Sequence, residues 1–236
     1  MKAVRPPWPQ TWAAVVCIVA VLLGIAAGLA SRTTPLHVYV VSLRRKVERR
    51  ARIRARAGGV EFVDAIDGHH LPSGTGSLSR GELACFYSHV AAWRRAVDTV
   101  ATQHFCLVLE DDANVKLPSA MTKIRTLVAA CPADWDILFL GLNNPPEDAE
   151  CVAQGGRWSV KRVTGDTWGL HAIALRGSGA RKLVRAWAQY GVRDPAGDTC
   201  PVDVWVSRMP GIKAYWVDPV LVKPFDITDS ETQNIR

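Results

Sequence analysis

Residues 105–112 read FCLVLEDD, in which an apolar run stops abruptly at three adjacent carboxylates. Phe105 to Leu109 has the length and the apolar character of a fully buried strand. In open α/β sheets, ligands bind beyond the carboxyl ends of the strands. The stretch therefore predicts both a central strand and a functional site at Glu110, Asp111 and Asp112.

The sequence before this stretch alternates predicted strands with predicted helices. Residues 36–43 (LHVYVVSL) indicate a buried strand, residues 46–57 a helix, and residues 60–65 another strand. Ser79 and Glu82 have the spacing of a capping box, so a helix is predicted from there to about residue 100. Its large apolar residues recur along one predicted buried face, which comprises Leu83, Phe86, Val90, Trp93 and Val97.

The same alternation continues after the carboxylates. The sequence predicts helices at 119–130, after Ser178 as a cap, and from Pro201 as the first helical residue. It predicts strands at 137–140, 159–163 (in a hairpin), 170–175 and 214–217. Strands that alternate with helices predict an α/β sandwich with a mainly parallel central sheet.

The amino-terminal segment has the composition of a membrane span. Residues 11–30 carry no charge, and about 20 helical residues match the thickness of the hydrocarbon layer. Trp8 and Trp12 lie where an interfacial aromatic belt is expected, which favours an uncleaved signal-anchor over a cleaved signal peptide or a buried helix. We therefore expect a tail at 1–10, a transmembrane anchor at 11–30, a linker at 31–35 and one catalytic domain at 36–236.

Charge and cysteine usage exclude some classes of function. The net charge is +7, and eight basic residues lie between Arg44 and Arg56, where Glu48 is the only acidic residue. Such a run is typical of a solvated helix face, and because no zinc-finger or RNP-type signature accompanies it, we expect no nucleic-acid partner. The six cysteines form no CxxC pair, which argues against a structural zinc site. One or two disulfides in an oxidising compartment remain open.

Three neighbouring carboxylates at a strand end repel one another and need a cation, hydrogen bonds or full solvation. Mg²⁺ and Mn²⁺ take oxygen ligands and are commonly held by protein carboxylates together with substrate phosphates. A solvated acidic turn is the alternative interpretation of this short string.

Seven segments, in order, resemble glycosyltransferase family 25, the group that contains lipopolysaccharide and collagen galactosyltransferases. They cover most of residues 36–235 and read VYVVSLRRKVERRARI (38–53), FVDAIDG (62–68), LSRGELACFYSHVAAWRRAV (78–97), FCLVLEDDANV (105–115), DWDILFLG (134–141), GLHAIALRGSGARKLV (169–184) and PVDVWVSRM (201–209). The resemblance implies a GT-A-like fold, a UDP-sugar donor, most often UDP-galactose, and Mn²⁺ or Mg²⁺.

The resemblance also implies roles for particular residues. Asp112, with Glu110 or Asp111, would hold the metal and the donor phosphates, and Arg45 and Arg49 would lie near the nucleotide. Ser88 and His89 match a Ser-His pair of the family and are secondary candidates for the donor site. Departures from the family pattern, such as Ser42 where Asn is usual, leave the donor sugar and the acceptor open.

An inverting transfer needs a carboxylate to take the proton of the acceptor hydroxyl. Asp203 and Asp166 are the two candidates outside the triad. Asp203 is favoured because its expected place in the first turn of a helix would keep it ionised and fix its direction.

We therefore expect a single-pass membrane glycosyltransferase with an extracytoplasmic or lumenal domain, acting on a glycan, lipid-linked saccharide or protein acceptor. A secreted form after signal cleavage is the alternative location. A catalytically silent binding module of the same fold and a metal-dependent phosphatase or nuclease are the alternative functions.

Overall fold

The computed structural model describes residues 36–145 and 149–225 of the 236-residue chain. The chain divides into two units, residues 1–36 and residues 37–236, and the fold described below is that of the second unit. The expected membrane segment, residues 11–30, lies outside the described residues. Within residues 36–145 and 149–225, no helix has the length and apolar character needed to cross a membrane.

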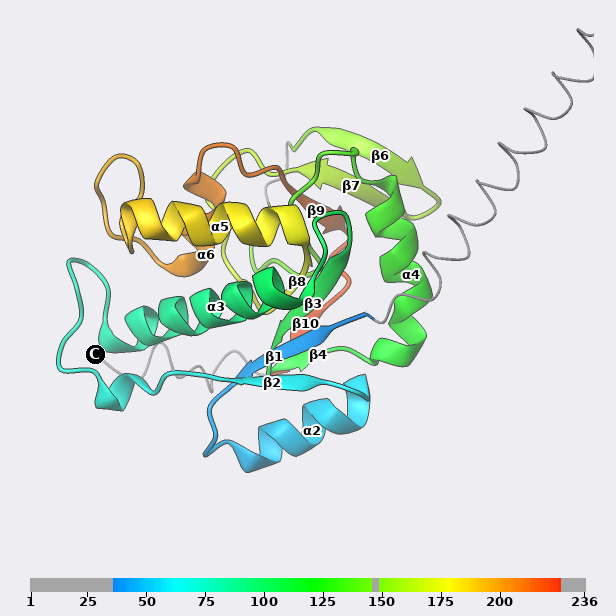
Figure 1. The fold of residues 1–236 in the computed structure, drawn as a ribbon. Helices are drawn as coiled ribbons and strands as arrows, with labels where there is room; N and C mark the ends of the chain where they lie inside the picture. The colour runs from blue at the N-terminus through cyan, green and yellow to red at the C-terminus, as the bar shows by residue number, and fades with distance from the viewer. Residues whose placement is uncertain (1–35, 146–148, 226–236) are drawn as a thin grey trace, which may run out of the picture. The chain divides into compact units, whose positions relative to one another are not determined.

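The centre of the domain is a mixed sheet in the strand order β2-β1-β3-β8-β5-β9-β7-β6 (Figure 1). The pairs β1 with β2, β1 with β3, and β5 with β9 are parallel, whereas β8 and β7 run against their neighbours. In that order the strands are Glu61–Asp64, Val38–Ser42, Phe105–Glu110, Ala172–Arg176, Ile137–Phe139, Ala214–Asp218, Trp158–Arg162 and Cys151–Gly155.

The expected α/β class is confirmed, and the sheet is largely parallel in that only β8 and β7 are reversed. The reversed position of β8 was not predicted. It runs in the same direction as β7, although no helix lies between these two strands in the chain. A second, two-stranded ribbon pairs β4 (Ala113–Asn114), directly after the carboxylates, with β10 (Lys223–Pro224).

Helices cover the sheet in two groups. Helix α3 (Arg80–Thr99) contacts α5 (Gly177–Tyr190) and α6 (Val202–Arg208), while α2 (Val47–Ala57) contacts α4 (Leu117–Ala130). A short 3₁₀ helix, Gly68–His70, precedes α3. Figure 1 shows α3 and α5 lying side by side along one side of the sheet.

The alternation of side chains along the strands builds a core on each face of the sheet. Tyr39, Val41, Cys106 and Val108 belong to one buried cluster with the apolar residues of α3, α5 and α6. The intervening residues face the other way, where α2 and α4 supply their own buried side chains. That second layer contains Val38, Val40, Leu107, Leu109, Ile53, Ile124 and Leu127.

An aromatic stack ties α6 to α3. The rings of Trp93 and Trp205 are stacked with centroids 5.9 Å apart, and Phe86 meets Trp205 edge-on at 5.2 Å. All three side chains are fully buried. Because Asp203 lies in the first turn of α6, this packing determines where that carboxylate sits relative to α3 and the sheet.

Only some of the predicted helix starts agree with the structure. The capping box of Ser79 and Glu82 is confirmed, with both of its hydrogen bonds present. The expectation that Ser178 caps α5 is wrong, because the cap position is Arg176 and the Ser178 hydroxyl instead contacts Asp136 Oδ1 at 3.4 Å. Pro201 is the residue before α6 and not its first helical residue.

Asp136 is a buried charge that joins three segments at the base of β5. Its Oδ2 accepts hydrogen bonds from Lys182 Nζ at 2.6 Å and from the Lys213 backbone amide at 2.9 Å, and the residue is 1% exposed. It links α5 and the segment before β9 to the start of β5.

We predict that Asp136→Ala lowers the free energy of unfolding by about 3 kcal/mol, because the amide and the ammonium group would lose their buried acceptor. Denaturant unfolding of the variant measures this loss. Asp134→Ala is the matched control, since Asp134 is exposed and should change stability by less than about 0.5 kcal/mol. Equal stability of the two variants would contradict the assignment.

Candidate functional site

The three predicted carboxylates lie at the carboxyl end of β3, but each has a different environment. Asp111 is buried and already neutralised within the protein. Its Oδ2 accepts a hydrogen bond from Ser42 Oγ at 2.6 Å, and its Oδ1 forms an ion pair with Arg49 at 2.9 Å. Asp111 therefore joins the ends of β3 and β1 to α2 and has little capacity left for a metal.

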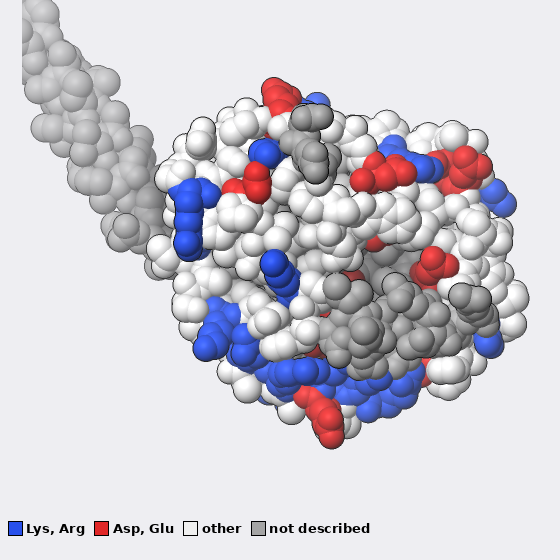
Figure 2. Space-filling view, turned by 180° about the vertical axis from the view of Figure 1, so that it is seen from behind, with Lys and Arg blue, Asp and Glu red and all other residues white. Residues whose placement is uncertain are grey.

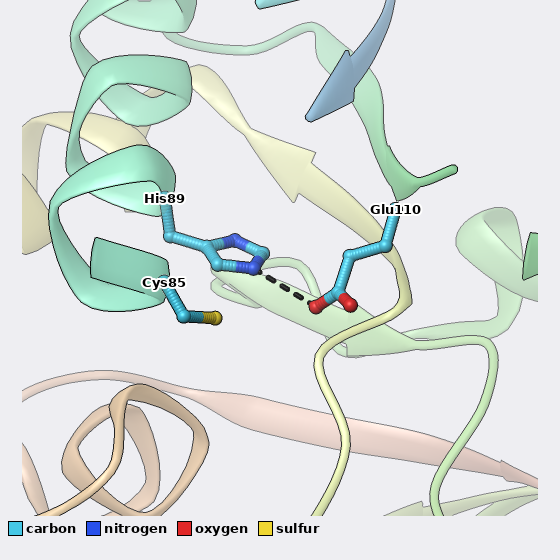
Figure 3. A group of neighbouring side chains, drawn as sticks. All are labelled: Cys85, His89 and Glu110. Carbon is cyan, nitrogen blue, oxygen red and sulfur yellow. Dashed lines mark hydrogen bonds and ion pairs between the residues drawn. The ribbon is translucent and has the colours of Figure 1, made fainter. Parts of the chain in front are cut away.

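Glu110 points toward α3, where it meets His89 (Figure 3). The distance from Glu110 Oε1 to His89 Nε2 is 3.0 Å, and the imidazole is fully buried. Burial acts to raise the pKa of Glu110, but the hydrogen bond to His89 and the charges of His89, His171 and Arg49 together outweigh it and leave the pKa below its ordinary value. His89 thus keeps Glu110 ionised and fixes its direction.

Asp112 is the least compensated of the three carboxylates. Its Oδ1 is buried and has no hydrogen-bond partner among the described residues. Burial, together with the negative charges of Glu110 and Asp111, raises the pKa of Asp112 to about 7. A carboxylate in this state lacks a cation, and the site fits a divalent ion at Asp112.

The first of two cavities at this edge of the sheet has a volume of about 110 Å³ and lies between α2, α3 and the ends of β1 and β3. Lys46 and Arg49 supply positive charge to its lining, and Glu110, Asp111 and Asp112 supply negative charge. Figure 2 shows, from the opposite side, Lys and Arg side chains gathered along the lower edge, where Figure 1 places α2.

The second cavity, of about 190 Å³, lies between α3, α6 and the segment before β8. Cys85, Glu110 and Asp112 line both cavities, so the two spaces meet at the carboxylates. The reversed direction of β8 explains this neighbourhood. Because β8 is antiparallel to β3, its first residues lie beside the last residues of β3, and the Glu110 amide donates to the His171 carbonyl at 2.8 Å.

Asp203 lies in the second cavity and is held by backbone amides. Its Oδ2 accepts from the Gly169 amide at 2.7 Å and its Oδ1 from the Val204 amide at 3.0 Å. Its place in the first turn of α6 is as expected. Burial raises the pKa of Asp203 and outweighs the two amide hydrogen bonds. A raised pKa suits a group that accepts a proton near neutral pH.

Asp166 is separated from the triad. It forms a two-pronged ion pair with Arg208, at 2.8 Å and 2.7 Å, and Arg208 also binds Asp194. Asp166 is not among the residues that line either cavity, and its hydrogen bonds to Arg208 lower its pKa. The structure therefore brings Asp203, and not Asp166, to the carboxylates.

The remaining candidates, Arg45 and Ser88, also differ in whether they line a cavity. Arg45 pairs with Asp67 at 2.7 Å, which lowers the pKa of Asp67 to about 2, and Arg45 does not line the first cavity. Ser88 lines that cavity, but its hydroxyl donates to the Ala84 carbonyl and accepts from the Ile66 amide. Ser88 thus joins α3 to the segment after β2.

Sequence reasoning missed several residues of the site. Lys46 was counted only within the basic run, although its position just before α2 could have indicated a phosphate-facing role. Asn143 and Trp168 line the second cavity and come from loops without any motif. Ser42, noted only as a departure from the family, is the hydrogen-bond donor to Asp111.

Ligand atoms of Cys85, His89 and Glu110 lie within 4.8 Å of one another, which makes them a second candidate metal cluster (Figure 3). Two observations argue against it. Burial raises the pKa of the Cys85 thiol well above its ordinary value, and His89 Nδ1 is buried without the hydrogen-bond partner that metal-bound histidines usually have. We interpret the His89 contact as a hydrogen bond that orients Glu110.

A divalent metal therefore fits best at Asp112, with Glu110 as a second ligand. Both carboxylates face the point where the cavities meet, and oxygen ligands suit Mn²⁺ and Mg²⁺. Asp111, the third predicted ligand, is engaged by Arg49 and Ser42.

The sequence of this chain is similar to those of proteins from one family. Residues 36–130 match the family model described as "Glycosyltransferase family 25 (LPS biosynthesis protein)". The chain is 30% identical over 197 residues to human "Inactive glycosyltransferase 25 family member 3", an alignment that covers 73% of this chain and 31% of the relative. It is 24% identical over 246 residues to mouse "Procollagen galactosyltransferase 2", covering 84% of this chain and 38% of the relative.

A mosquito protein from Anopheles gambiae, "Glycosyltransferase 25 family member", is 26% identical over 197 residues, covering 73% of this chain and 31% of the relative. The aligned part of the chain thus spans about a third of the length of these relatives. The matched region contains α2, α3 and the carboxylates after β3. The family resemblance of the sequence is confirmed, and this chain belongs to glycosyltransferase family 25.

Proposed function

We propose that this protein transfers a sugar, galactose, from a UDP-sugar to a hydroxyl group of a glycan, lipid-linked saccharide or protein acceptor, with Mn²⁺ or Mg²⁺. The observation that carries this proposal is the meeting of two cavities at Glu110 and Asp112. One cavity has basic residues in its lining and the other contains Asp203. The choice of galactose rests on the similarity to a procollagen galactosyltransferase.

The first cavity suits the nucleotide diphosphate. Lys46 and Arg49 line it close to the start of α2, where helix amides and the helix dipole favour anions. Arg49 remains bound to Asp111, so its position does not depend on the substrate. The uncompensated charge of Asp112 is then directed at the side of the cavity where the diphosphate would lie.

A divalent cation held by Asp112 and Glu110 would neutralise the leaving UDP as a Lewis acid. Residues of this chain hold the carboxylates around this position. His89 orients Glu110, while Arg49 and Ser42 bind Asp111 and leave it little capacity to bind the metal. The leaving oxygen then needs no protonated carboxylic acid, which a glycosidase requires.

Asp203 is the proposed base. The acceptor hydroxyl gives its proton to Asp203 while its oxygen forms a bond to the anomeric carbon, and the bond from that carbon to UDP breaks. Attack from the second cavity, opposite UDP in the first, inverts the anomeric centre. The amides of Gly169 and Val204 hold the carboxylate in one orientation for this step.

A catalytically silent module is the second candidate, because a relative at 30% identity is named inactive. Asp112 and Asp203 both favour the enzyme, since each is a partly buried carboxylate with a raised pKa at the shared edge of the cavities. A two-metal phosphatase or nuclease is disfavoured, because the second candidate cluster among the described residues, Cys85, His89 and Glu110, shares Glu110 with the Asp112 site and contains a thiol whose pKa is raised by burial.

We predict that the whole chain releases UDP from a UDP-sugar in the presence of Mn²⁺ and not with EDTA, and that Asp112→Asn lowers this rate by at least about 100-fold. The variant should be as stable as the wild type or more so, because it removes an unpaired, partly buried charge. Asp134→Asn, at an exposed aspartate, is the matched control. Normal Mn²⁺-dependent turnover by Asp112→Asn would disprove the metal assignment, and absence of turnover by the wild type with every UDP-sugar would favour the silent module.

We predict that Asp203→Asn lowers kcat for transfer by about 10² to 10⁴, the usual cost of losing a general base, with unchanged affinity for UDP. Asp166→Asn is the comparison, and its rate should stay within about threefold because Asp166 pairs with Arg208 outside both cavities. Steady-state kinetics with saturating donor distinguish the two. The reverse order of effects would assign the base to Asp166.

We also propose that residues 11–30 anchor the chain in a membrane, with residues 36–236 on the extracytoplasmic or lumenal side. The support is the uncharged length of the segment. We predict that sequencing of the mature amino terminus finds this segment retained and that the protein partitions with membranes. A mature chain that starts at Ser31 would show a cleaved signal and a secreted protein instead.

A further inference from the structure

Trp168 is an exposed aromatic residue beside a catalytic carboxylate. It is 44% exposed, one of three large hydrophobic residues with high exposure among those the structure describes, and it lines the second cavity. Single exposed hydrophobic residues are common on protein surfaces. Trp168 differs because hydrogen bonds hold the chain at this residue and at both of its neighbours.

The backbone around Trp168 is bonded to two different elements. Its carbonyl accepts from the Asn143 amide at 2.8 Å, and the next residue, Gly169, donates its amide to Asp203 at 2.7 Å. On the other side, the Thr167 hydroxyl donates to the Asp203 carbonyl at 3.0 Å. The indole is therefore carried by a segment whose position is coupled directly to the proposed base.

Gly169 is required at this place. Its φ of +101° is a conformation that other residues rarely adopt. A Cβ there would also lie 3.1 Å from the Asn143 side chain and 3.2 Å from His171 Nδ1. The close packing leaves Trp168 presented to the cavity while Asn143 stays beside it.

The charge of the cavity restricts what can bind. Glu82, Glu110, Asp112 and Asp203 are among its lining residues, and the described lining contains no Lys or Arg. Such a surface repels phosphate and other anions but suits a neutral ligand with many hydroxyl groups. An aromatic face with a few convergent polar groups is the usual composition of a site for a small, partly apolar ligand.

We propose that Trp168 is the platform of an acceptor subsite for a neutral pyranose ring. The apolar face of the sugar stacks on the indole. One sugar hydroxyl reaches Asp203, and the side-chain amide of Asn143 binds another. The subsite rests on the proposed function in that its occupant is the acceptor, and it narrows the acceptor class to one that ends in an uncharged sugar.

The test measures sugar binding directly. Saturation-transfer NMR on the whole chain with UDP present uses the methyl glycosides of galactose, glucose and mannose as probes. We expect signal transfer to the ring protons of at least one probe, a dissociation constant raised about tenfold or more in Trp168→Ala, and binding within about threefold of wild type in Trp168→Phe. Trp158→Ala is the matched control, because Trp158 is a half-buried indole on β7 that lines neither cavity.

Two results would overturn the subsite. One is a wild-type chain that binds none of the probes, and the other is Trp168→Ala with a dissociation constant within about twofold of wild type while UDP affinity is intact. The UDP-release assay distinguishes failure of the subsite from failure of the proposed function. Probe binding that depends on Trp168 without any sugar turnover supports the subsite and contradicts the transferase.

Discussion

The repulsion among Glu110, Asp111 and Asp112 is the constraint on which the site depends. Three adjacent carboxylates at the end of a buried strand cannot all stay ionised without compensation. The fold compensates Asp111 with Arg49 and Ser42, and Glu110 with His89. Asp112 is the least compensated, and burial together with the remaining repulsion raises its pKa to about 7. The motif therefore contains one anchoring residue, one oriented carboxylate and one carboxylate with a raised pKa, which is the proposed metal ligand.

The direction of β8 decides what faces this carboxylate. A parallel β8 would place its own carboxyl end beside the carboxyl end of β3. The antiparallel strand instead places its amino-terminal end there, together with the preceding residue His171. The preceding segment then reaches α6 through the bond from Gly169 to Asp203. The stack of Trp93 on Trp205 fixes α6 from the other side. The proposed base is thus positioned by one loop hydrogen bond and one apolar contact, which are independent of β3.

Local patterns in the sequence were sufficient for the elements but not for their arrangement. The apolar run at 105–109 and the capping box at Ser79 depend on neighbouring residues only, so both were predicted correctly. The reversal of β8 depends on which strands it pairs with, and this long-range pairing leaves no periodic pattern in the local sequence. The engagement of Arg45 by Asp67 and of Asp166 by Arg208 also joins residues more than 20 positions apart, and so could not be read from spacing. Trp168 belongs to no motif, and its exposure is a property of the folded chain.

The same residues explain why membership of the family does not by itself decide activity. Asp111, Arg49 and His89 hold the strand ends together, so their loss would disturb the fold as well as the site. Asp112 and Asp203 have raised pKa values because of burial, which means that their charges cost stability in the folded state. Neutral replacements at these two positions would be tolerated or favoured by the fold. A chain can therefore keep the framework of this family while losing catalysis, and retention of both unfavourable carboxylates here favours the proposed enzyme over the silent module.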